Sequence, residues 1–194
     1  MQLVLATNNR DKIKEIRHLL DDLPVTILTA DDFLEFPDIE ETGTTLAENA
    51  LLKARAYHSA RLPLVFGGDA GLEIDALNGE PGVQVRRWNG RFADDVDDQT
   101  WLAYLLQRLE GLPQSMRTAR WVAAWGVITP DGTEHVRHVR HEFMIAQRPL
   151  RPILDGSPMS AVELHSGDHL AYRQAWIADE WAQWGLLDRI VCSP

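Results

Sequence analysis

The chain has 194 residues, a formal net charge of −10 and 25% charged residues. This length suits a domain with a substantial hydrophobic core, and we expect residues 1–194 to form a single domain. The acidic balance argues against a general binder of nucleic-acid polymers, which needs a basic face. It does not exclude a small anionic ligand, because a local group of lysines and arginines can hold one inside an acidic protein.

Cysteine content and hydropathy further narrow the class of protein. The single cysteine, Cys192, excludes a disulfide framework and a cysteine zinc site within one chain. No apolar run approaches the roughly 18 residues that a membrane span needs, and the N-terminus lacks the pattern of a signal peptide. We therefore expect a cytoplasmic protein with no membrane partner.

Short apolar runs in the first half of the chain favour buried β-strands. The third run leads into Gly67-Gly68-Asp69, where we expect the strand to end. A helix is predicted over residues 10–21 from its apolar spacing, and another from about Thr45, which has capping-box spacing with Glu48. The strand segments are residues 2–6, 24–28, 64–66 and the first part of 71–83.

The second half of the chain combines helices with one long hairpin. Leucines at helical spacing predict a helix within residues 94–110, and residues 170–184 favour a last helix whose tryptophans are packing residues. Pro130-Asp131-Gly132 is a strong turn signal between two strand-like segments. These elements together indicate a mixed α/β domain.

The junction after the first strand carries Thr7, Asn8, Asn9 and Lys12 at the start of the predicted helix. Backbone N–H groups at a helix start, together with such side chains, can hold phosphate oxygens. A capped surface helix whose lysine faces solvent has the same pattern, so this stretch alone does not decide between the two.

Acidic residues form a second group of candidates, Glu40, Glu41 and Asp69. Carboxylate oxygens are the ligands that Mg²⁺ prefers, and an aspartate at the end of an apolar strand lies where open α/β sheets place their sites. Asp69 could there bind a metal or orient an attacking water. The structural alternative is an Asx turn at Asp69 and a solvated acidic loop.

Asn49 and Lys53 are four residues apart on a predicted helix, so they share one face. The lysine could reach a phosphate or extend to water.

Two other patterns favour a structural role over a catalytic one. The acidic run 94–98 is typical of a helix N-terminus, and the three histidines between 135 and 141 do not share one face of a strand.

Three segments match, in order and spacing, the motifs of one known family. They are LATNNRDKIKEI at 4–15, EETGTTLAENALLKA at 40–54 and GDAGLEIDALNGEPGV at 68–83. The chain therefore resembles the inosine triphosphate pyrophosphatase family, also called the Ham1 or RdgB family. The resemblance covers about the first half of the chain.

The resemblance implies a mixed, elongated central sheet flanked by helices, with two lobes around a cleft. It also implies hydrolysis of deaminated purine nucleoside triphosphates to the monophosphate and pyrophosphate, with Mg²⁺ as the cofactor. A homodimer is the assembly that the family commonly forms.

The resemblance also implies roles for individual residues. Asp69 would be the catalytic acidic residue, shared between metal binding and activation of water, and Lys53 would contact phosphate beside it. Glu40 would be a further metal ligand. The implied substrate-binding residues are Thr7, Asn8, Asn9, Lys12, Ala70 and Arg173.

The chain departs from the family pattern at several positions. Gly68 stands where the family commonly has an aspartate, and Ala70 where it has a serine. The Phe-Gly-Tyr-Asp-Pro segment that helps to select the purine is not found, and Tyr172 replaces the histidine of the closing motif. Two alternatives stay open: a pyrophosphatase for another modified nucleotide, or a degenerate relative that binds a nucleotide without hydrolysing it.

Overall fold

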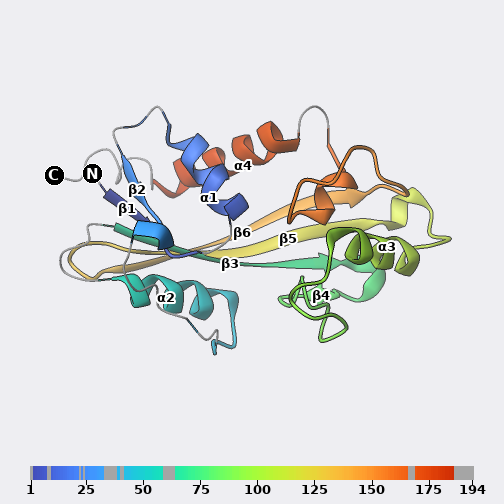
Figure 1. Cartoon of the computed structure of the whole chain (residues 1–194), viewed down its shortest axis with the longest axis horizontal. Helices are drawn as coiled ribbons and strands as arrows, with labels where there is room; N and C mark the ends of the chain where they lie inside the picture. The colour runs from blue at the N-terminus through green and yellow to red at the C-terminus, as the bar shows by residue number, and fades with distance from the viewer. Residues whose placement is uncertain are drawn as a thin grey trace. The chain divides into compact units, whose positions relative to one another are not determined.

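A computed structural model of the chain describes residues 2–7, 10–21, 23, 25–32, 39, 42–58, 64–165 and 169–185 (Figure 1). The chain divides into two compact units. The first unit comprises Met1–Asp69, Ala123–Val139 and Leu170–Pro194, and the second comprises Ala70–Val122 and Arg140–His169.

The described strands form one mixed sheet in the order β2-β1-β3-β5-β6-β7, with β4 paired to β3. β1 runs parallel to both β2 and β3, whereas β4 and β7 are short antiparallel additions. β5 and β6 are joined by the predicted turn at Pro130-Asp131-Gly132. The strands are β1 Gln2–Leu5, β2 Thr26–Leu28, β3 Leu64–Ile74, β4 Pro81–Gly82, β5 Thr118–Ile128, β6 Glu134–Ile145 and β7 Glu163–Leu164.

The predicted helices are confirmed, and so is the mixed α/β fold with helices flanking a central sheet. Asp97 caps one of them by accepting a hydrogen bond from the N–H of Thr100 at 2.8 Å, so the acidic run 94–98 does mark a helix start. None of the described helices is long and apolar enough to cross a membrane. The helices are α1 Arg10–Leu19, α2 Leu46–Tyr57, α3 Asp98–Arg108 and α4 His169–Trp184, with short 3₁₀ turns η1 Ala30–Asp32, η2 Asp75–Leu77, η3 Gln114–Met116 and η4 Pro158–Ala161.

Strand β3 corrects one prediction. It continues without a break from Leu64 to Ile74, so Asp69 lies in the middle of a strand. The expected strand end at Gly67-Gly68-Asp69 and the alternative of an Asx turn at Asp69 are both wrong. Glycine pairs often mark turns, but a glycine inside a strand can instead mark a place where another backbone approaches closely.

Helix α2 makes that close approach in the first unit. A Cβ atom added at Gly67 of β3 would lie 2.2 Å from the carbonyl oxygen of Ala50, which no real side chain tolerates. A Cβ added at Gly126 of β5 would lie 3.1 Å from Leu51 Cδ2 and 3.3 Å from the backbone of Ala50. The two glycines therefore let the helix backbone rest directly on the sheet.

Aromatic side chains fill the core of the first unit on the other side of β3. Trp181 of α4 is fully buried, and its ring centroid lies 5.2 Å from that of Phe66. Trp125 contacts both Phe66 and Trp176, with centroids 6.3 and 6.0 Å away. The expectation that the C-terminal tryptophans are packing residues is confirmed for Trp176 and Trp181.

The second unit has a core of its own. The buried Arg117 connects two segments of this unit. Arg117 is 2% exposed and donates hydrogen bonds to the carbonyls of Leu109, Ile145 and Ala146. These bonds tie the end of α3 to the end of β6, and burial lowers the pKa of the guanidinium below its usual value. The apolar core of this unit includes Leu72, Ile74, Trp88, Trp101, Leu105 and Phe143.

Two adjacent glycines test the packing of α2. Gly67→Ala should lower the free energy of unfolding by about 2–3 kcal/mol, because the new methyl group meets a backbone oxygen that cannot move aside alone. Gly68→Ala is the matched control: its Cβ would lie 3.4 Å from Trp125 Cδ1, an ordinary contact, and the change should stay within about 1 kcal/mol. Urea unfolding of both variants measures the difference. Equal losses would contradict the role assigned to Gly67.

Candidate active site

The first turn of α2 is fixed by a capping box, as predicted. The hydroxyl of Thr45 accepts a hydrogen bond from the N–H of Glu48 at 3.1 Å, and the Glu48 carboxylate accepts one from the N–H of Thr45 at 3.1 Å. The same carboxylate accepts bonds from the N–H and hydroxyl of Thr44, at 2.6 and 2.7 Å. The helix start is therefore well defined, and so is the direction in which its next residues point.

Lys53 and Asn49 of α2 both reach Asp69 in β3. The ammonium of Lys53 lies 3.2 Å from Asp69 Oδ1 and 3.4 Å from the carbonyl oxygen of Gly68. Asn49 Nδ2 donates to Asp69 Oδ2 at 3.2 Å, while Asn49 Oδ1 accepts a bond from the N–H of Gly43 at 2.8 Å. One carboxylate is thus held by a cation on one oxygen and by an amide on the other.

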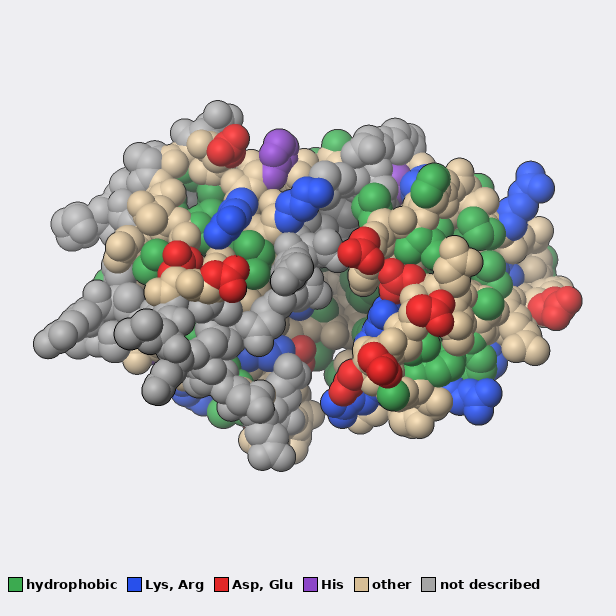
Figure 2. Space-filling view, viewed as in Figure 1, with side chains coloured by type: hydrophobic (Ala, Val, Ile, Leu, Met, Phe, Trp, Pro, Cys, Tyr) green, Lys and Arg blue, Asp and Glu red, His purple; other side chains and the backbone are tan. Residues whose placement is uncertain are grey.

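Burial distinguishes this ion pair from the arginine–carboxylate pairs among the described residues. Acidic and basic side chains of the described residues are interspersed on the face shown in Figure 2, and exposed pairs such as Arg87–Asp94 contribute little to stability. The Lys53 and Asp69 side chains are only 15% and 14% exposed. Water screens such a pair less, so its charges act more strongly on a bound ligand.

The arrangement can perform two kinds of chemistry. A carboxylate offers about four lone-pair sites, and the described bonds to Asn49 and Lys53 leave room for a cation or a water molecule. Asp69 can therefore bind a metal, or orient and deprotonate water. Lys53 can stabilise negative charge that develops nearby.

The remaining candidate residues are described to different extents. Thr7 and Lys12 are half-buried in the first unit, at the end of β1 and in α1. Ala70 directly follows Asp69 in β3, and Arg173 belongs to α4, although its side chain is outside the described part of the chain. Three candidates lie entirely outside the described residues, Asn8, Asn9 and Glu40, as does Glu41.

Gly68 lies on the opposite face of β3 from Asp69. Successive side chains of a strand point to opposite faces, so a side chain at position 68 would face away from the α2 side. A Cβ at Gly68 would contact Trp125 and Phe66 instead, at 3.4 and 3.6 Å. A carboxylate at this position would therefore lie against aromatic rings.

Sequence reasoning placed Asn49 on the face of Lys53 but gave it no role. The signal was the spacing of four residues along α2, which the structure confirms. The contact between Asn49 and Asp69 joins residues 20 positions apart, and nothing in the local sequence indicates it.

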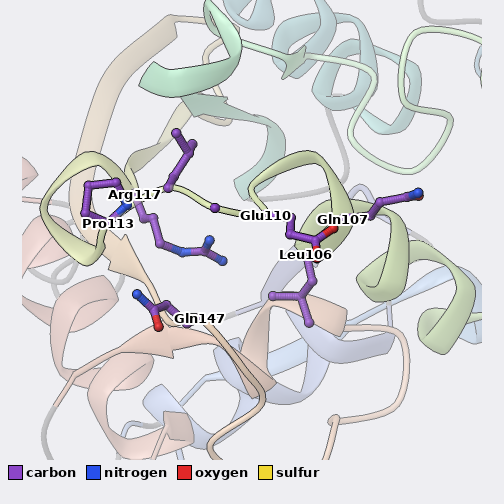
Figure 3. Close-up of a pocket in the computed structure, with 8 residues that line it drawn as sticks. Leu106, Gln107, Glu110, Pro113, Arg117 and Gln147 are labelled. Atoms are coloured by element: carbon purple, nitrogen blue, oxygen red, sulfur yellow. The ribbon is translucent and has the colours of Figure 1, made fainter.

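A cavity in the second unit lies apart from these residues in the sequence. It has a volume of about 570 Å³ and is lined by the end of α3, the segment that follows it and Gln147. Figure 3 shows Arg117 directed into it, with Glu110 and Leu106 across from it. Because the guanidinium of Arg117 is engaged by three backbone carbonyls, we assign it a structural role.

These features define a mixed α/β protein with a half-buried lysine–aspartate site between one helix and the central sheet. The chain belongs to the Ham1 family, whose profile matches residues 3–151.

Relatives and solved structures agree with this family. The dITP/XTP pyrophosphatase of Streptomyces coelicolor is 45% identical over 138 residues, which are 70% of this chain and 67% of that protein. That of Desulforamulus reducens is 42% identical over 135 residues, 70% of this chain and 66% of that protein. The chain thus spans about two thirds of the length of the curated relatives that it matches.

The likeness in fold reaches further along the chain. A HAM1 protein from Coxiella burnetii has a TM-score of 0.69 at 25% identity, over 94% of this chain and 99% of that one. A nucleoside-triphosphatase / dITP/XTP pyrophosphatase from Mycobacterium abscessus has a TM-score of 0.63 at 29% identity, over 93% and 98%. The likeness in fold therefore extends beyond residue 151, where the profile match ends.

The capping box makes a prediction about pH. Hydrogen bonds from the hydroxyl and N–H of Thr44 hold the pKa of Glu48 below its ordinary value of 4.5. A lowered pKa contributes stability that is present above about pH 4.5 and is lost as the pH falls through the folded-state value. Glu48→Gln should therefore destabilise the protein most at neutral pH, and the difference from the parent should shrink below pH 4.5.

Unfolding in urea across pH 3–7 measures this difference. Gln107→Asn, at an exposed glutamine outside α2, is the control: no titratable group changes, so its difference from the parent should not vary with pH. If Glu48→Gln lowered the free energy of unfolding by the same amount at every pH, the proposed contribution of the Glu48 charge to the capping box would be contradicted.

Proposed function

We propose that this protein hydrolyses deaminated purine nucleoside triphosphates to the monophosphate and pyrophosphate. The observation that carries the proposal is the half-buried contact of 3.2 Å between Lys53 and Asp69, which lie in two different family motifs. The relatives named dITP/XTP pyrophosphatase support the reaction and the substrate class.

In this proposal, Asp69 orients the attacking water and accepts a proton from it. The water oxygen then bonds to the α-phosphorus, the bond from that phosphorus to the bridging oxygen breaks, and pyrophosphate leaves. Lys53 exchanges its contact with Asp69 for phosphate oxygens, where it stabilises the charge of the transition state. The site thus combines a base and a cation that are already held together.

The donor set fits a divalent cation, and we propose Mg²⁺. The described residues hold no group of three potential metal ligands. Mg²⁺ needs only one or two carboxylates, because substrate phosphates and water complete its shell. Asp69 would supply one carboxylate and Glu40 is the predicted second. When bound, the metal would offset phosphate charge and polarise the reacting phosphoryl group.

Thr7, Asn8, Asn9, Lys12, Ala70 and Arg173 are proposed to bind the nucleotide. A cytoplasmic homodimer is the proposed state of the protein. The alternative of a nucleotide-binding protein without turnover is separated from the enzyme by the experiment below.

Pyrophosphate release tests the function directly. The parent, with Mg²⁺, is expected to hydrolyse inosine or xanthosine triphosphates faster than standard nucleoside triphosphates. Asp69→Asn should lower kcat by about 10²–10⁴-fold, because the amide cannot accept the proton of water. Asp94→Asn, at an exposed aspartate paired with Arg87, is the matched control and should leave the rate unchanged.

Other outcomes have distinct meanings. Nucleotide-dependent thermal stabilisation without pyrophosphate release would establish the binding protein and overturn the enzyme. Turnover confined to pyrimidine triphosphates would overturn the purine specificity but keep the reaction class.

A further inference from the structure

We propose that Asn49 is the positioning residue of the site, which holds the Asp69 carboxylate in place while Lys53 moves to the substrate. This inference rests on the proposed function and adds a role that the family assignment does not supply. Asn49 is not expected to touch the reacting atoms, so its effect on the reaction passes through Asp69.

The hydrogen bonds of Asn49 determine which way its amide faces. An asparagine side chain has one accepting and one donating end, and only the surrounding network shows which is which. The N–H of Gly43 can only donate, so the end 2.8 Å from it must be the oxygen Oδ1. Nδ2 therefore faces Asp69 Oδ2 and donates to it at 3.2 Å.

The amide of Asn49 is engaged at both of its ends. The Asn49 side chain is nearly buried, at 9% exposure. Lys53 carries its charge on a flexible four-carbon stem, and its ammonium is a point charge that can change partners. A phosphate that attracts Lys53 thus leaves the bond from Asn49 to Asp69 in place.

Gly43 shows that the approach of Asn49 to the chain before α2 is close. A Cβ atom at Gly43 would lie 2.4 Å from Asn49 Oδ1 and 2.9 Å from the backbone nitrogen of Asn49. Only glycine fits at this distance. Asn49 therefore links Gly43 on one side with β3 on the other, and Gly43 is three residues after the predicted metal ligand Glu40.

The arrangement gives the two oxygens of Asp69 separate roles. The hydrogen bond from Asn49 to Oδ2 stays in place and fixes the plane of the carboxylate. Oδ1, which faces Lys53 at 3.2 Å, becomes available when Lys53 moves to the phosphates. The proton of the attacking water would pass to this oxygen.

The isosteric variant Asn49→Asp separates the two hydrogen bonds of Asn49, the one that positions Asp69 and the one that holds Gly43 before α2. An aspartate at position 49 can still accept a hydrogen bond from the N–H of Gly43, but it cannot donate one to Asp69. We expect kcat to fall on the order of 100-fold with KM changed by less than about threefold, because the base is misplaced while phosphate binding remains. Asn89→Asp, at an exposed asparagine, adds the same charge and should leave both constants unchanged. An unchanged kcat in folded Asn49→Asp would overturn the proposal.

A stability cycle tests the same contact without using activity. Asn49→Asp should lower Tm, because it places two carboxylates against each other in a half-buried site. The exchange variant Asn49→Asp with Asp69→Asn restores one amide and one carboxylate, so it should regain most of that loss in Tm while remaining inactive. Losses in Tm that simply add in the double variant would overturn the proposal.

The two measurements also separate this inference from the proposed function. A parent that releases no pyrophosphate would contradict the function, whereas recovery of Tm in the exchange variant would still establish the coupling of Asn49 to Asp69. If Asn49→Asp alone does not fold, a folded exchange variant supports the coupling and an unfolded one overturns it.

Discussion

The close packing of α2 against the sheet is the constraint on which the site depends. Gly67 and Gly126 remove the side chains that would separate the helix backbone from β3 and β5. At that short distance, side chains of moderate length on α2 reach the strand itself, and Asn49 and Lys53 contact Asp69 directly. A helix held further away would need longer side chains or bridging water to reach the same carboxylate.

The same geometry accounts for the electrostatics of the site. Lys53 and Asp69 are largely shielded from solvent, and such a pair is costly to form unless further hydrogen bonds complete it. Asn49 and the carbonyl of Gly68 supply those bonds. The result is a charge pair whose hydrogen bonds are made without substrate, and the proposed phosphate binding at Lys53 would replace one of these partners.

The departures from the family pattern have different structural meanings. Gly68 faces the aromatic side chains Phe66 and Trp125, so its lack of a carboxylate does not deprive the α2 side of β3 of a ligand. Beyond residue 151 the family profile no longer matches, yet α4 still completes the first unit through Trp181 and Trp176. The described part of the C-terminal segment therefore contributes to the core of the first unit although it lies outside the profile match.

The sequence by itself determined the local elements, because capping at Thr45, turn residues at 130–132 and apolar periodicity act between near neighbours. It also pointed to Lys53 and Asp69 through their motifs. It misplaced the end of β3, since a Gly-Gly pair has the same composition in a turn and under a closely packed helix. Only the tertiary structure decided that α2 packs directly against Gly67 and that Gly68 faces the aromatic core. It also decided that Asn49 is hydrogen-bonded to both Gly43 and Asp69. Those contacts link residues that are far apart in the chain or depend on the face of a strand, and local sequence carries no record of either.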